Sequence, residues 1–303
     1  MSPVQELCQV RERRRVGEYH SLTLVAPRIA EAARPGQFVH LQVPEDRSLS
    51  LRRPFSIWRV GRSAGGSGGP PGWSPGGSGS GGPPGWSPGG PGTVEVVFDV
   101  VGAGTRVLAG LRPQDVVDAL GPLGRAFDPP MAPAGCVLVG GGYGAAPLFF
   151  LTSELRARGC RVDVVIGAAT AGRLLDATEA GRLGHSLTVT TDDGSAGRRG
   201  LVTDPLPGLL AGTGAERVFA CGPMPMLAAV SRVAAAAGVP CQVAVEEQMA
   251  CGTGICFSCV VPVGVGGGSG ETRMARSCLE GPVFDGTAIA WAELGYPELE
   301  PTG

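Results

Sequence analysis

The sequence predicts a multidomain α+β protein. An antiparallel β-barrel domain is expected in residues 1–130, an α/β domain with a parallel sheet in 131–240, and a small cysteine-rich segment in 241–303. Three observations predict this organisation. The first part has short strand-like runs broken by proline and glycine, the second alternates strands with helices, and the third has four grouped cysteines and little periodicity. A length of 303 residues suits about two ordinary domains plus such a segment.

Charge and hydropathy exclude several classes of protein. The formal net charge is -2, so electrostatics give no reason to expect nucleic acid or an anionic membrane as a partner. No run of about 18 apolar residues is present, and we expect no membrane span. Residues 1–15 contain four arginines but lack the apolar stretch of a secretory signal. We therefore expect a cytoplasmic protein whose cysteines are reduced.

The barrel is predicted from period-2 runs. Residues 19–25, 37–43 and 93–101 alternate β-branched or aromatic residues with polar ones, and turn residues bound each run. Residues 61–92 lie between the last two runs. In this stretch a twelve-residue glycine- and proline-rich sequence occurs twice, at 66–77 and 79–90. We expect this stretch to be a disordered insertion in a hairpin loop, because it has too few apolar side chains to offset the entropy of ordering.

The α/β domain is predicted from alternation of buried strands and helices. Strand-like runs begin at residues 136, 161, 186, 217 and 241, and the first lies before a helix in which Leu148, Leu151 and Leu155 share one face. Residues 225–237 form an alanine-rich helix candidate that ends at Gly238. Such alternation is typical of a parallel sheet with right-handed crossovers.

A glycine-rich loop follows the first strand of this domain. Gly140, Gly142 and Ala145 match the pattern G-x-G-x-x-A of dinucleotide-binding loops, which bring backbone N–H groups close to a pyrophosphate. A plain glycine turn is the alternative. Asp163 has the spacing of the usual acidic partner but lies inside a strand, so we interpret it as structural. Asp192 and Asp193 favour NADH, since their charges would repel a 2′-phosphate.

Arginines in the same domain leave NADPH open as the alternative cofactor. Arg173, Arg198 and Arg199 could accept a 2′-phosphate, so NADPH is not excluded by the sequence.

Four cysteines near the C-terminus have a metal-ligand spacing. Cys251, Cys256 and Cys259 form C-x4-C-x2-C, and Cys278 follows, which is the pattern of plant-type [2Fe–2S] sites. Gly252 and Gly254 would let the backbone turn tightly and direct N–H groups toward sulfur. A zinc site or structural thiols are the alternatives. The other cysteines (Cys8, Cys136, Cys160, Cys221 and Cys241) are interpreted as buried residues, with Cys221 a partial exception.

Acid–base catalysis is not expected. The chain has three histidines and no Ser/His/Asp or paired-carboxylate arrangement. His20 and His40 lie on strand patterns and are interpreted as ordinary surface or core residues. The predicted phosphate loop and thiolate site instead indicate a redox protein whose cofactors supply the chemistry.

Several short motifs occur in one order along the chain. They are Arg53-Pro-Phe-Ser, Gly104-Thr, Gly121-Pro-Leu-Gly, the loop from Gly140, Cys221-Gly-Pro-Met-Pro-Met, and the two cysteine segments at 249–259 and 277–286. Together they resemble the electron-transfer subunits of type B dihydroorotate dehydrogenases, which are ferredoxin reductase-like proteins. The resemblance covers nearly the whole chain outside residues 61–92.

The resemblance implies three cofactor sites. The FAD-binding residues would be Arg53 at the pyrophosphate, Pro54, Phe55 and Ser56 near the isoalloxazine, Val97, Phe98 and Asp99 on the neighbouring strand, and Gly104 and Thr105 at the phosphates. NAD(H) would bind Gly140, Gly141, Gly142 and Gly144, with Cys221, Gly222 and Pro223 near the nicotinamide and flavin rings. The [2Fe–2S] cluster would be held by Cys251, Cys256, Cys259 and Cys278.

The chain departs from the family pattern at three places. A basic residue is common where this chain has Asp99, so only backbone contact with phosphate is expected there. Gln248 replaces a common arginine, and the glycine-rich loop at 264–270 lengthens the connection before Cys278.

The resemblance also implies a function. NADH, FAD and the cluster would form an electron relay to the FMN of a separate catalytic subunit that oxidises dihydroorotate to orotate in pyrimidine biosynthesis. Two copies of each subunit would form a heterotetramer, with net electron flow toward NAD⁺. One alternative is an NADH-dependent reductase that serves a hydrogenase, ferredoxin or oxygenase. Another is a non-catalytic nucleotide- or metal-binding regulator.

Overall fold

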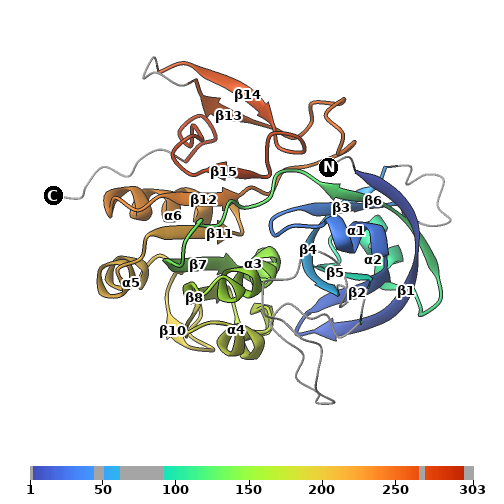
Figure 1. Cartoon of the computed structure of the whole chain (residues 1–303), viewed down its shortest axis with the longest axis horizontal. Helices are drawn as coiled ribbons and strands as arrows, with labels where there is room; N and C mark the ends of the chain where they lie inside the picture. The colour runs from blue at the N-terminus through green and yellow to red at the C-terminus, as the bar shows by residue number, and fades with distance from the viewer. Residues whose placement is uncertain (1–2, 44–50, 62–89, 91, 266–269, 297–303) are drawn as a thin grey trace.

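The computed structural model describes residues 3–43, 51–61, 90, 92–265 and 270–296 (Figure 1). The insertion predicted at 61–92 lies outside the described residues except for Gly61, Gly90 and Gly92.

The N-terminal part forms a closed six-stranded barrel, as predicted (Figure 1). Its strand order is β1-β2-β5-β4-β3-β6, and every neighbouring pair is antiparallel. The strands are β1 (Val4–Val16), β2 (Tyr19–Val25), β3 (Phe38–Leu41), β4 (Arg53–Gly61), β5 (Thr93–Phe98) and β6 (Val116–Leu123). Two short helices belong to this domain, α1 (Pro27–Ala32) and α2 (Ala103–Ala109).

Alternation along the strands builds the barrel core. Val39 and Leu41 of β3 enter the barrel interior with Phe55 and Ile57 of β4, while Phe38 packs in a separate apolar cluster. The longest strand, β1, was not singled out from the sequence, because its exposed positions carry charged residues that conceal the alternation.

The predicted insertion connects two paired strands. Gly61 at the end of β4 pairs with Thr93 at the start of β5, and the Gly92 N–H donates to the Gly61 carbonyl at 2.6 Å. The segment therefore joins two neighbouring antiparallel strands, as expected of an insertion in a hairpin loop.

The second domain is a seven-stranded sheet of order β10-β9-β8-β7-β11-β12-β15. The strands are β7 (Gly135–Gly141), β8 (Arg161–Ala168), β9 (Ser186–Thr191), β10 (Arg198–Arg199), β11 (Arg217–Cys221), β12 (Cys241–Ala244) and β15 (Val283–Asp285). Six strands are parallel, as predicted, whereas β15 pairs antiparallel with β12. The sequence pattern did not predict this edge strand, since it has three residues and follows the cysteine segment.

Helices cover both faces of the sheet (Figure 1). They are α3 (Ala146–Ala157), α4 (Ala177–Leu183), α5 (Leu206–Thr213) and α6 (Met224–Ala236). Cys136 and Leu138 of β7 pack in the core with α3 and α4, while Val137 and Val139 pack in the core with α5 and α6. The predicted helix at 225–237 is therefore confirmed within one residue at each end.

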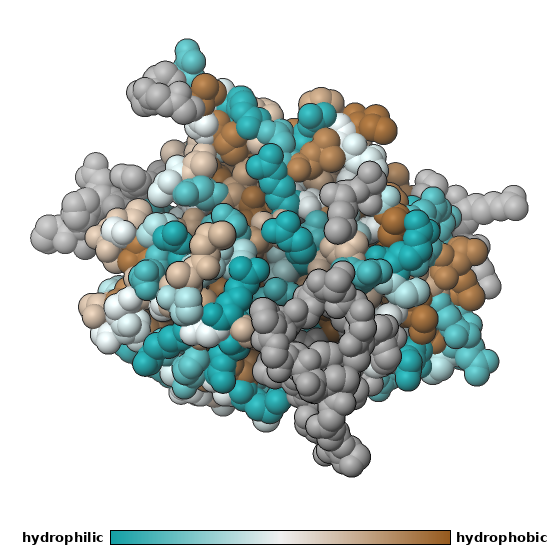
Figure 2. Space-filling view, viewed as in Figure 1, coloured by the Kyte–Doolittle hydropathy of each residue, from teal (hydrophilic) through white to brown (hydrophobic). Residues whose placement is uncertain are grey.

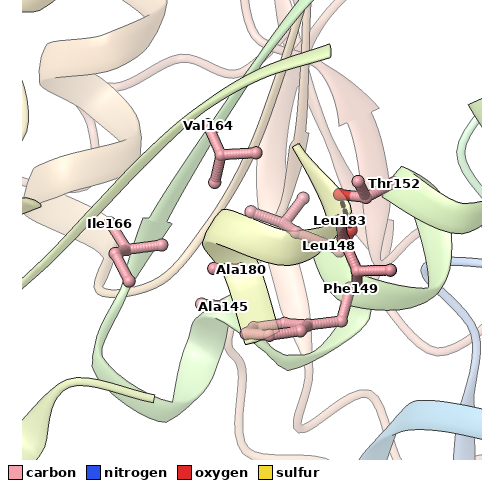
Figure 3. Close-up of a pocket in the computed structure, with 8 residues that line it drawn as sticks. All are labelled: Ala145, Leu148, Phe149, Thr152, Val164, Ile166, Ala180 and Leu183. Carbon is pink, nitrogen blue, oxygen red and sulfur yellow. Dashed lines mark hydrogen bonds between the residues drawn. The ribbon is translucent and has the colours of Figure 1, made fainter. Parts of the chain in front are cut away.

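Helix α3 also joins the sheet domain to the barrel. The ring of Phe149 meets Trp58 of β4 edge to face, with centroids 5.9 Å apart, and Phe150 enters the barrel core. A small apolar hollow lies beside this helix (Figure 3). It is lined by Ala145, Leu148, Phe149, Thr152, Val164, Ile166, Ala180 and Leu183. The one polar group there, the Thr152 hydroxyl, donates to the Leu148 carbonyl at 2.7 Å, so the hollow is part of the packed interior.

The cysteine-rich segment is attached to both domains. A hairpin of β13 (Val260–Gly264) and β14 (Thr272–Arg276) is its main regular element. Met249, Cys259 and Cys278 pack against Phe38 and Leu123 of the barrel, and β15 extends the sheet on the other side. No helix in the described ranges combines the length and the hydropathy needed to cross a bilayer.

Candidate cofactor sites

The residues predicted to hold the FAD pyrophosphate come together from two elements. Arg53 begins β4 and Gly104 lies in the first turn of α2. A Cβ added to Gly104 would lie 2.9 Å from Nε of Arg53, so the missing side chain makes room for the guanidinium. Arg53 Nη1 donates to the Leu51 carbonyl at 2.7 Å, which fixes the side chain at the start of the strand.

Thr105 stabilises the turn before α2. Its Oγ1 accepts hydrogen bonds from the N–H groups of Val101 and Gly102, at 3.0 and 3.1 Å. The Thr105 hydroxyl is therefore used within the turn, where it holds the backbone beside Arg53. The structure thus gives the Gly104-Thr105 motif a positioning role for the loop.

The aromatic residues predicted beside the flavin lie largely inside the barrel wall. Phe55 and Phe98 are buried and their ring centroids are 5.1 Å apart, while Pro54 and Ser56 keep partial exposure. Val97 is also buried. The exposed edge of this motif is therefore formed by Pro54 and Ser56.

Asp99 faces the nucleotide domain. Its Oδ1 accepts from the Val100 N–H at 2.7 Å, and its Oδ2 forms an ion pair with Arg173 at 3.4 Å. Arg173 also pairs with Glu18 at 3.4 Å, and its carbonyl accepts from the Tyr19 hydroxyl at 2.8 Å. Arg173, which the sequence left as a candidate for contact with a 2′-phosphate, thus also joins the two domains.

The predicted phosphate loop has tight packing that explains its small residues. Gly140 is the second-last residue of β7, and a Cβ there would lie 2.5 Å from Cβ of Ala145 in the next turn. Gly142 has φ +55, a conformation that glycine adopts without strain. The strand therefore turns sharply into α3 through a 3-10 turn at Gly142–Ala145.

The phosphate loop packs directly on the Cys221-Gly-Pro motif. A Cβ on Gly144 would lie 2.7 Å from Cα of Gly222, and one on Gly222 would lie 3.0 Å from the nitrogen of Gly141. Gly222 has φ +155, and Pro223 Cδ would lie 2.9 Å from a Cβ on Gly141. The structure therefore brings together two motifs that are about 80 residues apart in the sequence.

A carboxylate that the sequence analysis missed lies beside this junction. Glu246 follows β12, and burial raises its pKa. Burial, followed by the charge of Glu246, raises the pKa of the Cys221 thiol well above its usual value and that of Tyr143 to about 12. An acidic residue just after a parallel strand was the available signal, since ligands bind at the carboxyl ends of such strands.

Three predicted ligand cysteines lie in the segment before β13, and Cys278 follows β14 at the other end of the hairpin. Cys251 is partly exposed, and its sulfur accepts from the N–H groups of Thr253 and Ile255 at 3.4 and 3.3 Å. Burial alone would raise its pKa, but these donors and that of Cys256 outweigh it and lower the pKa of Cys251 to about 6. The backbone therefore stabilises a thiolate at this position.

The other three cysteines complete the donor set. Cys256 is exposed and its sulfur lies 3.2 Å from the Ser258 hydroxyl, which lowers its pKa. Cys259 and Cys278 are buried neighbours, and burial followed by Cys259 raises the pKa of Cys278 to about 12. No three of the described Cys, His, Asp or Glu side chains converge closely enough to hold a metal ion in this conformation.

The chemistry of the loop nonetheless fits a [2Fe–2S] cluster. Its donors are four thiols, N–H groups already point at sulfur, and Gly252 and Gly254 have φ +70 and +80. The five scattered cysteines are buried, as predicted.

Comparison with known proteins identifies the family. Residues 246–290 match the model of the iron-sulfur cluster binding domain of dihydroorotate dehydrogenase B. The chain is 35% identical to the dihydroorotate dehydrogenase B (NAD(+)) electron transfer subunit of Desulforamulus reducens over 266 residues. This alignment covers 88% of this chain and 90% of that protein. The subunit of the same name from Geobacillus thermodenitrificans is also 35% identical, over 267 residues and with the same coverage.

The chain belongs to the family of dihydroorotate dehydrogenase B electron transfer subunits. The resemblance drawn from the motifs is thereby confirmed, as is the assignment to an oxidoreductase complex. The match to an iron–sulfur domain also favours the [2Fe–2S] interpretation of the cysteine loop over a zinc site.

Solved structures support the same fold. A structure described as an NADH-dependent reduced ferredoxin-NADP oxidoreductase, studied for flavin-based electron bifurcation, superposes with a TM-score of 0.75 at 28% identity. It covers 95% of this chain, which in turn covers 91% of that one. A ferredoxin reductase of carbazole 1,9a-dioxygenase superposes with a TM-score of 0.59 at 18% identity, covering 79% of this chain and 68% of its own. This chain thus has the ferredoxin reductase-like architecture.

Proposed function

We propose that this chain relays electrons between NAD(H), FAD and a [2Fe–2S] cluster, and exchanges them with the FMN of a separate subunit that oxidises dihydroorotate. Family membership supports the electron-transfer role. The observation that carries the proposal is the double attachment of the cysteine segment. It packs on the barrel through Phe38 and Leu123 and on the nucleotide sheet through β15.

FAD and NAD(H) would each bind to residues that the structure brings together. Arg53 beside Gly104 would hold the FAD pyrophosphate, and Pro54 and Ser56 would line the ring. The nucleotide loop would bind NAD(H), since the sharp turn from β7 into α3 would bring its backbone N–H groups close to a pyrophosphate.

The protein contributes position, and the cofactors contribute redox chemistry. When bound, the nicotinamide exchanges electrons in pairs, the flavin in pairs or singly, and the cluster singly. Tyr19 and Tyr143, whose rings meet edge to face at 5.6 Å, connect the barrel to the nucleotide loop. Arg59 and Asp176 form an ion pair at 3.2 Å that holds the two domains in register. These contacts keep the two cofactor sites of the domains at a fixed separation.

A catalytic partner subunit follows from the family, and we propose where it binds. Ile255, Phe257 and Leu279 around the cysteine loop are exposed by 79, 58 and 44%. Hydrophobic residues also stand out among hydrophilic ones at the upper part of the face in Figure 2. Apolar side chains that flank a one-electron carrier suit an interface, because electron transfer requires a short path into the partner. Two copies of each subunit in the complex are part of the proposal.

Spectroscopy tests the cofactor content. The anaerobically purified protein should show flavin absorbance and, after reduction, the EPR signal of a [2Fe–2S] cluster. Cys256→Ser should abolish the cluster signal while most of the flavin remains, because Cys256 lies outside the barrel. Cys160→Ala is the matched control, since it removes a buried thiol far from the loop in sequence. A normal cluster signal in Cys256→Ser would refute the ligand assignment.

Partner capture distinguishes the main alternative. The full chain should form a stable complex with an FMN-containing, dihydroorotate-oxidising subunit and should then couple dihydroorotate oxidation to NAD⁺ reduction. A stable complex with a hydrogenase, ferredoxin or oxygenase and none with that subunit would instead establish a reductase of the same architecture.

A further inference from the structure

His40 is a buried side chain whose polar atoms lack partners. It lies in β3 of the barrel with 0% of its surface exposed. Neither Nδ1 nor Nε2 has a hydrogen-bond partner among the residues that the structure describes. Buried polar groups are nearly always hydrogen-bonded, and an unsatisfied one costs about 1–3 kcal/mol. The ring therefore indicates a partner that is not an atom of the described chain.

The polar edge of this ring faces the cysteine loop. A Cβ added to Gly252 would lie 2.7, 2.8 and 3.0 Å from Cε1, Nδ1 and Nε2 of His40, so the edge that carries both nitrogens is the edge that meets the loop. Gly252 directly follows Cys251. Any side chain at position 252 would collide with the imidazole, so the glycine allows the histidine to approach the loop backbone.

The other side of His40 adjoins the proposed flavin site. His40 pairs with Pro54 on the neighbouring strand β4, where Pro54 follows Arg53. The ring of Phe38, two residues earlier on the same strand, meets the His40 ring edge to face at 5.6 Å and packs against Cys259 and Cys278. His40 thus lies between the strand that would carry the flavin and the loop that would carry the cluster.

The imidazole ring of His40 can donate a hydrogen bond in either protonation state. A neutral imidazole has one N–H donor and one acceptor nitrogen. Thiolate and sulfide sulfurs accept hydrogen bonds, and such bonds are among the factors that set the potential of iron–sulfur clusters.

We propose that His40 donates a hydrogen bond to a sulfur of the cluster held by Cys251, Cys256, Cys259 and Cys278. The inference rests on the proposed function. Reduction adds negative charge to the cluster, so a donor at sulfur stabilises the reduced form more than the oxidised form. His40 therefore raises the reduction potential of the cluster, which favours the transfer of an electron onto it.

Redox titration followed by EPR measures the effect. His40→Leu fills the site without a donor, and we expect it to lower the equilibrium constant for one-electron reduction at least tenfold, a shift of about 59 mV toward negative potential. His40→Gln retains an N–H and should recover part of the shift. Leu24→Val is the matched packing control, because it trims a buried barrel side chain on β2, away from the cysteine loop, without removing a donor, and its potential should stay near that of the parent protein.

A second measurement detects the contact between the histidine and the cluster directly. Pulsed EPR on the reduced protein labelled with ¹⁵N-histidine should detect a nitrogen coupled to the cluster, and His40→Gln should lose that coupling. The inference would be overturned if the labelled protein showed no ¹⁵N coupling, or if the parent protein and His40→Leu had equal cluster potentials. In either case the cluster itself would remain established. Absence of any [2Fe–2S] signal in the parent protein would instead refute the proposed function. If His40→Leu does not fold, the labelled parent protein still decides the question.

Discussion

The contact between Gly222 and the nucleotide loop predicts a large effect from a single methyl group. Gly222→Ala would place a Cβ 2.8 Å from Cε of Met226, 3.0 Å from the nitrogen of Gly141 and 3.1 Å from its Cα. Met226 can move, because its side chain is flexible, but the two backbone atoms can move only with the loop. The φ of +155 adds strain for any residue with a side chain.

The magnitude follows from these two contributions. A residue held in a region that only glycine favours costs about 1–3 kcal/mol, and overpacking against fixed backbone costs a further ~1–3 kcal/mol. A shift of the nucleotide loop at Gly141 would relieve this strain, but the loop would then lose the backbone geometry that binds the nucleotide. Even the lower end of the combined range, about 2 kcal/mol, corresponds to a roughly 30-fold weaker affinity for the nucleotide.

The assay is the KM for NADH in dye reduction, together with thermal unfolding of the flavin-loaded protein. We expect a KM about 30-fold higher or more, with flavin content and the cluster EPR signal retained. Gly208→Ala is the matched control, because α5 has open space around this exposed glycine. It should stabilise the protein by about 0.4–1 kcal/mol and leave the KM unchanged. An unchanged KM in Gly222→Ala would refute the proposed role of this junction.

Three further predictions follow. Asp163 is buried, and hydrogen bonds from Arg161 and Ser186 outweigh its desolvation and lower its pKa. The ionised carboxylate therefore stabilises the folded protein at pH values above 3.8, the pKa of an unfolded aspartate, and this stabilisation is lost as the pH falls below it. Asp163→Asn should thus lower the free energy of unfolding by about 1.5–3 kcal/mol at pH 7 and by less in acid. The KM for NADH should not change, and an increase would make Asp163 a ligand. The Asp176 carboxylate accepts from the Glu179 N–H and forms an ion pair with Arg59, and the backbone at Asp176 has φ +42. Urea unfolding should show Asp176→Ala about 2 kcal/mol less stable than Asp176→Asn, since only asparagine keeps the cap and tolerates this conformation, and equal values would contradict this. Deleting residues 62–89 should leave flavin content and NADH oxidation intact, because Gly61 and Thr93 already pair, and loss of flavin would contradict it.

Residues whose role depends on local backbone were predictable from the sequence. The glycine loop after β7, the helix at 225–237 and the cysteine spacing each have a short-range signature, because turns, caps and ligand spacing are set by neighbours in the chain. The barrel and the parallel sheet followed from hydrophobic periods of two and of 3.6 residues.

Features that depend on long-range packing were not predictable. The fit of Gly144 on Gly222 and of Gly252 on His40 joins residues that are far apart in sequence, and a glycine alone does not say what approaches it. Glu246 and β15 were missed for a similar reason, since their positions depend on strand order. His40 was interpreted as ordinary because nothing in a strand pattern distinguishes a satisfied histidine from an unsatisfied one.

The three-residue strand β15 has a consequence for the protein without its cofactors. It is the element that covers the outer edge of β12, and it begins five residues after Cys278. If loss of iron and sulfide loosens the cysteine segment, β12 presents unpaired N–H and C=O groups to other chains, which is a template for intermolecular strand pairing. Cluster assembly would then protect this subunit from aggregation as well as complete its electron path.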